Sequence, residues 1–134
     1  MIRRPLPPSA KRAGWVGCNI LLDQIPALGK ISLIEAGRIV APETVHVRWR
    51  KTAFIGTEKA VDMRGWTLVV LKCIEMLKSR TFSLQELYCY ESMLATRHPG
   101  NKHIKEKIRQ QLQVLRDKGI LEFRSSGNYE LIGE

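Results

Sequence analysis

The sequence lacks long apolar runs and is poor in acidic residues. It holds no stretch of about 18 apolar residues, and no apolar segment follows its basic, proline-rich start. We therefore expect neither a membrane span nor a secretory signal, and a cytoplasmic location. Only 13 acidic residues stand against 22 Lys and Arg, which gives a formal charge of +9 at pH 7. Such a charge favours an anionic partner.

Cysteine is too scarce for a disulfide or zinc framework. Cys18, Cys73 and Cys89 are odd in number and form no Cys-x-x-Cys pair. The three histidines also lack the partner spacing of a zinc site. We expect reduced, half-buried cysteines, with Cys73 and Cys89 as small core residues. No cofactor is expected in this chain.

Length and composition predict a folded protein of one domain, or of one small domain with an appendage. The chain has 134 residues, of which 44% are hydrophobic and 26% are charged. A disordered chain would have too few apolar residues to offset the entropy lost on ordering.

The positive charge is concentrated in two segments. Arg3, Arg4, Lys11 and Arg12 precede the first acidic residue, Asp23. Residues 102–118 contain six basic and two acidic residues. Two basic clusters suggest nucleic acid as the polyanion, although a solvated surface that keeps a small protein soluble is the simpler alternative.

Residues 1–60 read as a basic arm followed by a small β-rich segment. The three prolines among the first eight residues favour an extended arm. Ile31–Ile34 and Arg38–Val40 flank a turn that contains Gly37, as in a hairpin. Residues 43–54 fit either a helix or a half-buried strand, and we favour a helix. The polar run 56–63 is the expected boundary to a second domain, residues 61–134.

Residues 61–134 show the order of a winged helix. An apolar helix begins at Arg64, a second helix begins at a capping box formed by Ser83 and Glu86, and a third runs from an Asn101 cap to Gly119. Strands at 120–124 and 129–132 flank a tight turn, and Thr81 and Phe82 could add a third strand. The predicted fold class is therefore α+β, with three helices and a hairpin wing.

The third helix presents residue types that read DNA. With Ile104 pointing inward, the opposite face carries Lys102, Glu106, Arg109 and Gln113, bordered by His103 and Gln110. Arginine suits guanine, glutamine suits adenine, and lysine suits phosphate. A solvated helix with a Lys102–Glu106 pair is the alternative. The full set of candidate DNA contacts is Arg12, Lys102, His103, Lys105, Glu106, Lys107, Arg109, Gln110, Gln113, Arg124 and Asn128.

Three segments resemble a known family. Residues 12–20, residues 64–67 and above all the run His103–Lys118 closely resemble the C-terminal part of the Dam-replacing family of methyl-directed (type IIM) restriction endonucleases. The resemblance spans essentially the whole chain, with gaps between Arg38 and Asp62. Coincidence does not explain a run as long as that of the third helix.

The resemblance implies a methyl-directed DNA reader. Members of the family cut GATC sites that carry N6-methyladenine. They use an N-terminal PD-(D/E)XK nuclease domain with a four-cysteine zinc site and a C-terminal winged helix that reads the same sequence. This chain would match the end of the nuclease domain and the winged helix, and its partner would be methylated double-stranded DNA in a bacterial nucleoid or a phage-encoded system. Trp15 matches a tryptophan that lies against the adenine methyl groups, although the residues alone would make it a core anchor beneath the arm.

The sequence also departs from the family. The 134 residues contain no Asp-x-Lys or Glu-x-Lys and lack the four zinc cysteines, so Mg²⁺ and Zn²⁺ are expected only in the nuclease domain of full-length relatives. We expect no cleavage by this chain alone. It could be a C-terminal fragment, a split-gene partner of a separate nuclease chain, or a standalone reader. A further possibility is an assembly subunit that docks through residues 15–60 onto a nuclease fragment and binds DNA only weakly alone. A winged-helix transcriptional regulator is the alternative function, and no small-molecule substrate is indicated.

Overall fold

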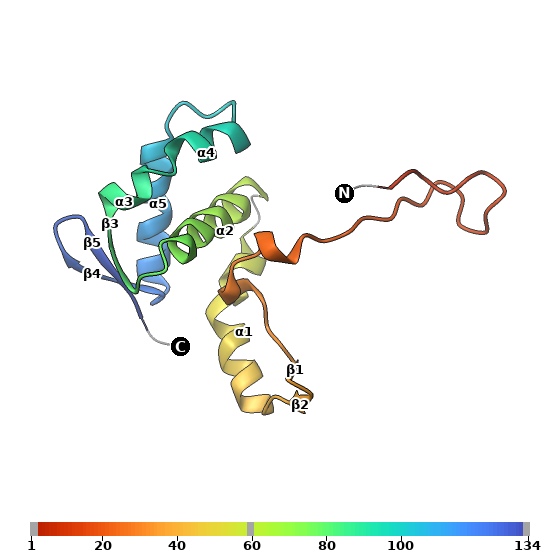
Figure 1. Cartoon of the computed structure of the whole chain (residues 1–134), viewed down its shortest axis with the longest axis horizontal. Helices are drawn as coiled ribbons and strands as arrows, with labels where there is room; N and C mark the ends of the chain where they lie inside the picture. The colour runs from red at the N-terminus through yellow and green to blue at the C-terminus, as the bar shows by residue number, and fades with distance from the viewer. Residues whose placement is uncertain (1–2, 59–60, 133–134) are drawn as a thin grey trace.

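The core forms around the helix with the most regular apolar stripe, α5 (Ile104–Asp117). Ile104, Ile108 and Leu115 are buried on its inner face, where α2 (Val61–Met76) packs across it with Trp66 and Val70. The computed structural model describes residues 3–58 and 61–132. Figure 1 shows α2, α5 and the C-terminal strands together in one body, with the N-terminal arm extending away from it.

All buried apolar side chains of the central cluster come from the C-terminal part of the chain. They are Trp66, Val70, Leu71, Cys73, Ile74, Phe82, Leu87, Leu94, Ile104, Ile108, Leu112, Leu115, Ile120 and Leu121. The apolar periodicity predicted on the first and third helices is therefore confirmed as a core-facing pattern.

The predicted second helix is two helices, α3 (Leu84–Tyr88) and α4 (Glu91–Arg97). The capping box at its start is confirmed: the Glu86 N–H donates to Ser83 Oγ at 3.2 Å, and the Ser83 N–H donates to Glu86 Oε2 at 2.7 Å. The continuous helix that we expected is wrong. The Tyr90 N–H donates to the Leu87 carbonyl, three residues back, which tightens and ends the first helix.

This break also corrects the assignment of the cysteines. Cys73 is buried in the core, as predicted, but Cys89 lies at the break between α3 and α4 and is exposed. Cys18, expected to be half-buried, is exposed in the arm. Burial raises the pKa of the Cys73 thiol to about 11, against a small opposing effect of Arg97.

Helix α5 begins later than predicted and ends where predicted. Asn101 does not cap it: its Oδ1 accepts the His103 N–H at 2.8 Å, which closes a turn ahead of the helix, and His103 is the N-cap. At the other end Gly119 has a φ of +70°. The Ile120 N–H donates to the Leu115 carbonyl at 2.9 Å and the Gly119 N–H to that of Arg116 at 2.9 Å, a Schellman motif.

The wing is a three-stranded antiparallel sheet. β3 (Thr81–Ser83), β4 (Leu121–Ser125) and β5 (Asn128–Leu131) lie in the order β3-β5-β4. Tyr129 on β5 pairs with Phe82 on one side and Phe123 on the other. Both the hairpin and the predicted third strand are confirmed, and with the helices they complete a winged helix in an α+β chain.

Residues 3–58 hold more helix than the expected β-rich segment. The hairpin is confirmed, but its strands β1 (Ile34–Glu35) and β2 (Arg38–Ile39) are short. The largest element is α1 (Pro42–Thr57), which confirms the helix favoured for residues 43–54. Pro42 at the first helical position and Glu43 in the first turn favour a helix start. Two short 3₁₀ turns, η1 (Leu22–Gln24) and η2 (Ala27–Gly29), precede the hairpin.

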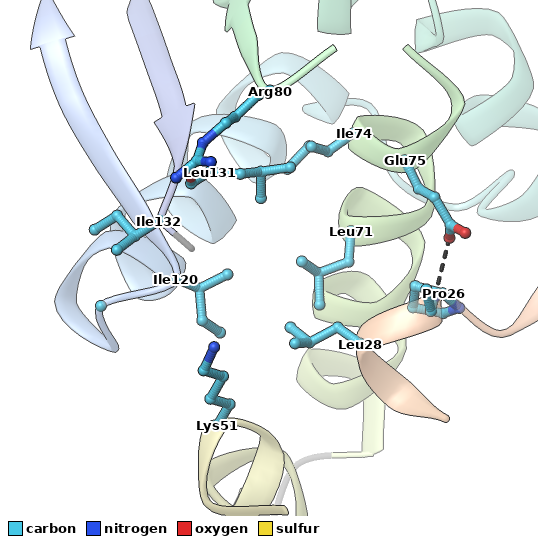
Figure 2. A pocket seen from close by; sticks show the side chains of 12 residues that line it. Pro26, Leu28, Lys51, Leu71, Ile74, Glu75, Arg80, Ile120, Leu131 and Ile132 are labelled. Atoms are coloured by element: carbon cyan, nitrogen blue, oxygen red, sulfur yellow. Dashed lines mark hydrogen bonds between the residues drawn. The ribbon is translucent and has the colours of Figure 1, made fainter. Parts of the chain in front are cut away.

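The segment around η2 attaches to the winged helix. The Ala27 N–H donates to Glu75 Oε2 at 3.1 Å, and Leu28 and Phe54 pack against the core. A cavity of about 340 Å³ lies at this junction. Figure 2 shows Leu28, the α2 residue Leu71 and Ile120 among the side chains that line it. Its walls are mainly apolar side chains.

The boundary expected at residue 60 falls between α1 and α2, where residues 59 and 60 lie outside the described residues. Whether the two parts are separate domains remains a prediction. In the described part of the chain, every helix is too short or too polar to cross a bilayer.

Replacing Ser83 with Ala should lower the free energy of unfolding by about 1 kcal/mol, because the N-cap oxygen that accepts the Glu86 N–H is lost. Urea denaturation followed by circular dichroism measures this change. Ser126→Ala, in the exposed turn of the wing, is the matched control and should change stability by less than about 0.5 kcal/mol. Equal effects of the two substitutions would contradict a role for the cap.

Candidate nucleic-acid interface

One face of α5 and the residues just before it are open to solvent. Lys102 and His103 are exposed ahead of the helix, and Lys105, Glu106, Arg109, Gln110 and Gln113 are exposed on it. The amphipathic pattern explains the arrangement, since the residues between these positions form the buried stripe. The structure thus brings seven of the predicted contact residues to one surface, which we call the α5 face.

Two cations of the α5 face take part in exposed ion pairs. Arg109 Nη2 lies 3.5 Å from Glu106 Oε1, and Lys105 Nζ lies 3.5 Å from Glu91 Oε2. The same Lys105 ammonium lies 5.3 Å from the centre of the Tyr88 ring. Exposed pairs of this kind contribute only about 0 to 1 kcal/mol, so a phosphate can replace the carboxylate at little cost.

Lys107 differs from the other cations because it is half-buried. Its Nζ lies 3.1 Å from Gln110 Oε1 and 3.8 Å from the sulfur of Met63 on α2. These contacts orient both Lys107 and Gln110 relative to α2.

The two predicted contact residues of the wing have partners within the wing. Arg124 Nε donates to Glu130 Oε2 at 2.6 Å, and a second carboxylate, Glu122, lies 3.4 Å from its Nη2. These two acids raise the pKa of the Arg124 guanidinium, the Glu130 hydrogen bond contributing most. Asn128 Nδ2 donates to Ser125 Oγ at 2.9 Å and so holds the turn. Both residues remain exposed.

Arg12 and Trp15 lie in the arm, which folds back on itself. The Leu6 N–H donates to the Trp15 carbonyl at 2.9 Å, and the Arg3 N–H donates to that of Gly17 at 2.9 Å. Trp15 is 57% exposed, so the expectation of a core anchor is wrong. The arm, which contains both residues, extends away from the winged helix and from α5 (Figure 1).

Sequence reasoning missed several polar residues around α5. Gln111 is fully buried, and its Oε1 accepts from the Thr67 hydroxyl at 2.7 Å. The burial of Gln111 could have been predicted from the sequence. Ile104, Ile108, Gln111 and Leu115 follow one another at intervals of four, three and four residues, which puts Gln111 in the middle of the apolar stripe.

Two tyrosines lie beside the α5 face. The Tyr88 hydroxyl is buried and has no hydrogen-bond partner among the described residues. Burial and the nearby Tyr88 raise the pKa of Tyr129, while Arg116 and Arg109 oppose that shift. Arg116 is exposed near the end of α5 and pairs with Asp117 at 3.0 Å.

Within residues 3–58 and 61–132, no group of three His, Cys, Asp or Glu side chains is placed to hold a metal ion.

Two family models match the chain. One, described as the Dam-replacing HTH domain, matches residues 62–131, and the other, described as the Dam-replacing family, matches residues 1–58. The chain belongs to the Dam-replacing family. The helix-turn-helix match covers α2 through β5, so the α5 face belongs to the matched helix-turn-helix domain. A Dam-replacing chain with this domain binds DNA, and the basic α5 face is the surface suited to that role.

DNA binding should weaken steeply with salt, because Lys102, Lys105, Lys107 and the basic arm release counterions when they contact phosphates. If about five phosphates are contacted, a plot of log Kd against log salt concentration should have a slope of magnitude about 4 to 5. Fluorescence anisotropy of a labelled duplex between about 50 and 200 mM salt measures it. An affinity independent of salt would contradict the phosphate contacts.

Proposed function

We propose that the chain reads N6-methyladenine in GATC sites of double-stranded DNA, as the recognition part of a methyl-directed restriction system. The observation that carries this proposal is the pairing of Arg109 and Gln110 on the exposed surface of α5, within a Dam-replacing HTH domain. The family resemblance of the run His103–Lys118 supports the same assignment.

The two side chains suit the two kinds of base in the site. A guanidinium can donate two hydrogen bonds to O6 and N7 of guanine, and Arg109 lies in an exposed pair with Glu106 at 3.5 Å. An amide can accept from N6 and donate to N7 of adenine, which suits Gln110. In the methylated A·T pair the remaining N6–H donates to thymine, so the groove edge presents only N7 and the methyl group. Gln110 would then donate to N7, and a methyl reader packs apolar atoms against the methyl group.

The arm supplies a second candidate contact with the methyl groups. Trp15 corresponds by resemblance to the tryptophan of the family that lies against methylated adenine, and its exposed indole is accessible to a base. A flat indole can enclose a methyl group that an unmethylated adenine would leave as an unfilled gap. Arg12, three residues before it, would contact the phosphate backbone.

Cleavage would be performed by residues outside these 134. The sequence contains no Asp-x-Lys or Glu-x-Lys with which to hold Mg²⁺ and activate water. The catalytic part would come either from further sequence of the same protein or from a separate nuclease chain, and that part would hold the Mg²⁺ and Zn²⁺. A winged-helix transcriptional regulator is the second candidate, since the helix-turn-helix and the missing motif fit it equally well.

The full chain should bind a GATC duplex methylated on both strands more tightly than the unmethylated duplex or a scrambled one. Arg109→Ala should lower affinity for the methylated site and narrow the difference from the scrambled duplex, because a base contact is lost. Lys102→Ala, its control on the same face, should weaken all three duplexes about equally. Anisotropy titrations measure the three affinities, and equal binding of all duplexes by the unmodified chain would refute methyl recognition.

Purified chain with Mg²⁺ should leave methylated plasmid intact, because the acidic residues and lysine of the PD-(D/E)XK site are absent from the sequence. Agarose electrophoresis of supercoiled plasmid reports any nick or cut. A product that depends on this protein and on Mg²⁺ would show that catalytic residues of another kind are present.

A further inference from the structure

A polar contact lies in the middle of the helix pair on which DNA recognition depends. Gln111 is fully buried and interrupts the apolar stripe of α5, with Ile108 and Leu115 on either side. Thr67 on α2 is also buried, with 5% of its surface exposed. Together they are the two polar residues among the buried residues that the structure describes.

Four side chains make this contact, two from each helix. The Thr67 hydroxyl lies 2.7 Å from Gln111 Oε1 and 2.9 Å from the Met63 carbonyl, and its single proton serves these two acceptors. Gln111 Nε2 lies 3.9 Å from the Met63 sulfur, and Lys107 Nζ lies 3.8 Å from the same atom. Met63 and Thr67 are thus one turn apart on α2, and they face Lys107 and Gln111, one turn apart on α5.

We propose that Gln111 and Thr67 are positioning residues that fix the register of α5 on α2 and thereby set DNA specificity. This proposal rests on the proposed function, because it concerns how the α5 face is aimed at the bases. Neither residue contacts DNA in this account. Their role is to hold the helix that carries the contacts.

The argument for register begins with the apolar neighbours. Contacts among isoleucine and leucine side chains are not directional, so several alignments of two apolar stripes are close in energy. A shift of α5 by one turn, about 5.4 Å, would put Ile108 or Leu115 opposite Thr67 and bury the Gln111 amide among apolar groups. An unpaired buried amide is strongly disfavoured. A single buried asparagine fixes the register of coiled coils in the same way.

The same contact reaches the DNA-reading surface. Lys107 touches Met63 and also donates to Gln110 Oε1 at 3.1 Å. A one-turn shift exceeds the spacing of about 3.4 Å between successive bases, so it would move Arg109 and Gln110 to other base pairs. Phosphate contacts by flexible lysines tolerate such a shift far better. Loss of register should therefore reduce specificity while non-specific affinity remains.

The test compares stability with specificity in full-length variants. Thr67→Val leaves the buried Gln111 amide oxygen without its hydroxyl donor, whereas in Gln111→Met the Thr67 hydroxyl keeps its bond to the Met63 carbonyl. The double variant replaces both residues with apolar side chains of similar shape. The double variant should recover most of the melting temperature lost in Thr67→Val, because the stranded Gln111 amide is gone. Specificity is measured as the Kd for a scrambled duplex divided by the Kd for the methylated GATC duplex. In the double variant this ratio should nevertheless be roughly tenfold lower than in the unmodified chain. The salt dependence of binding should not change.

Thr96→Val is the matched control. Its hydroxyl donates to the Ser92 carbonyl at 3.0 Å within α4, the same local bond as that of Thr67 but in an exposed position. It should leave the ratio of affinities unchanged.

A second pair of variants covers the case in which the apolar variants do not fold. Thr67→Ser keeps the hydroxyl and Thr67→Ala removes it with nearly the same loss of volume. Thr67→Ser should retain the Kd ratio of the unmodified chain, and Thr67→Ala should lower it. Both are measured at a temperature where circular dichroism shows the two variants to be folded.

Four outcomes would overturn the proposal. If the double variant had the same ratio of Kd values as the unmodified chain, the pair would serve stability alone. The same conclusion would follow if the Kd ratio fell in proportion to the melting temperature in all variants. Equal ratios for Thr67→Ser and Thr67→Ala would have the same meaning. If the unmodified chain bound the scrambled and methylated duplexes equally, the proposed function would fail and this inference with it. That result would be seen before any substitution is made, so it is distinct from a failure of this inference alone.

Discussion

The packing of α5 against α2 is the interaction on which the rest of the structure depends. The stripe of Ile104, Ile108 and Leu115 turns one side of α5 inward, and the opposite side is exposed because the helix has a period of 3.6 residues. The buried stripe and the basic α5 face are therefore two consequences of one pattern. The capping box of α3 and the Schellman motif at Gly119 then direct the chain into the neighbouring helix and the wing.

The α5 face and the wing use their charges differently. Arg109 and Lys105 take part in exposed ion pairs at 3.5 Å, which are weak and can be exchanged for phosphate or base contacts. Arg124 is held by two carboxylates of its own hairpin, one at 2.6 Å, so a contact with DNA would compete with an existing hydrogen bond. The cations of α5 are thus the better candidates for binding, and those of the wing have a larger part in holding the hairpin.

Short sequence patterns predicted most helices and strands. They failed where contacts between distant residues determine the structure. Ser83, Glu86 and Gly119 act through hydrogen bonds to nearby backbone, so their roles follow from short spacings and were confirmed. The break after α3 lies between the buried residues Leu87 and Leu94, which pack into the same core. The later start of α5 comes instead from the turn in which Asn101 accepts the His103 N–H. On the α5 face the exposed residues were predictable from period alone. The buried partner of Gln111 was not, because Thr67 lies 44 positions earlier in the sequence.

The two parts of the chain differ in how completely they bury their apolar side chains. Among residues 3–58 only Pro26 is buried, while Ile39 is 84% exposed and Trp49 is 55% exposed. The winged helix has a shared core, but the N-terminal part gains its order from a few contacts such as those of Leu28 and Phe54 with that core. Segments with few buried contacts open at low free energy. The arm that carries Trp15 can therefore adapt to a partner at little cost, whereas the α5 face keeps its shape because the core beneath it is closed.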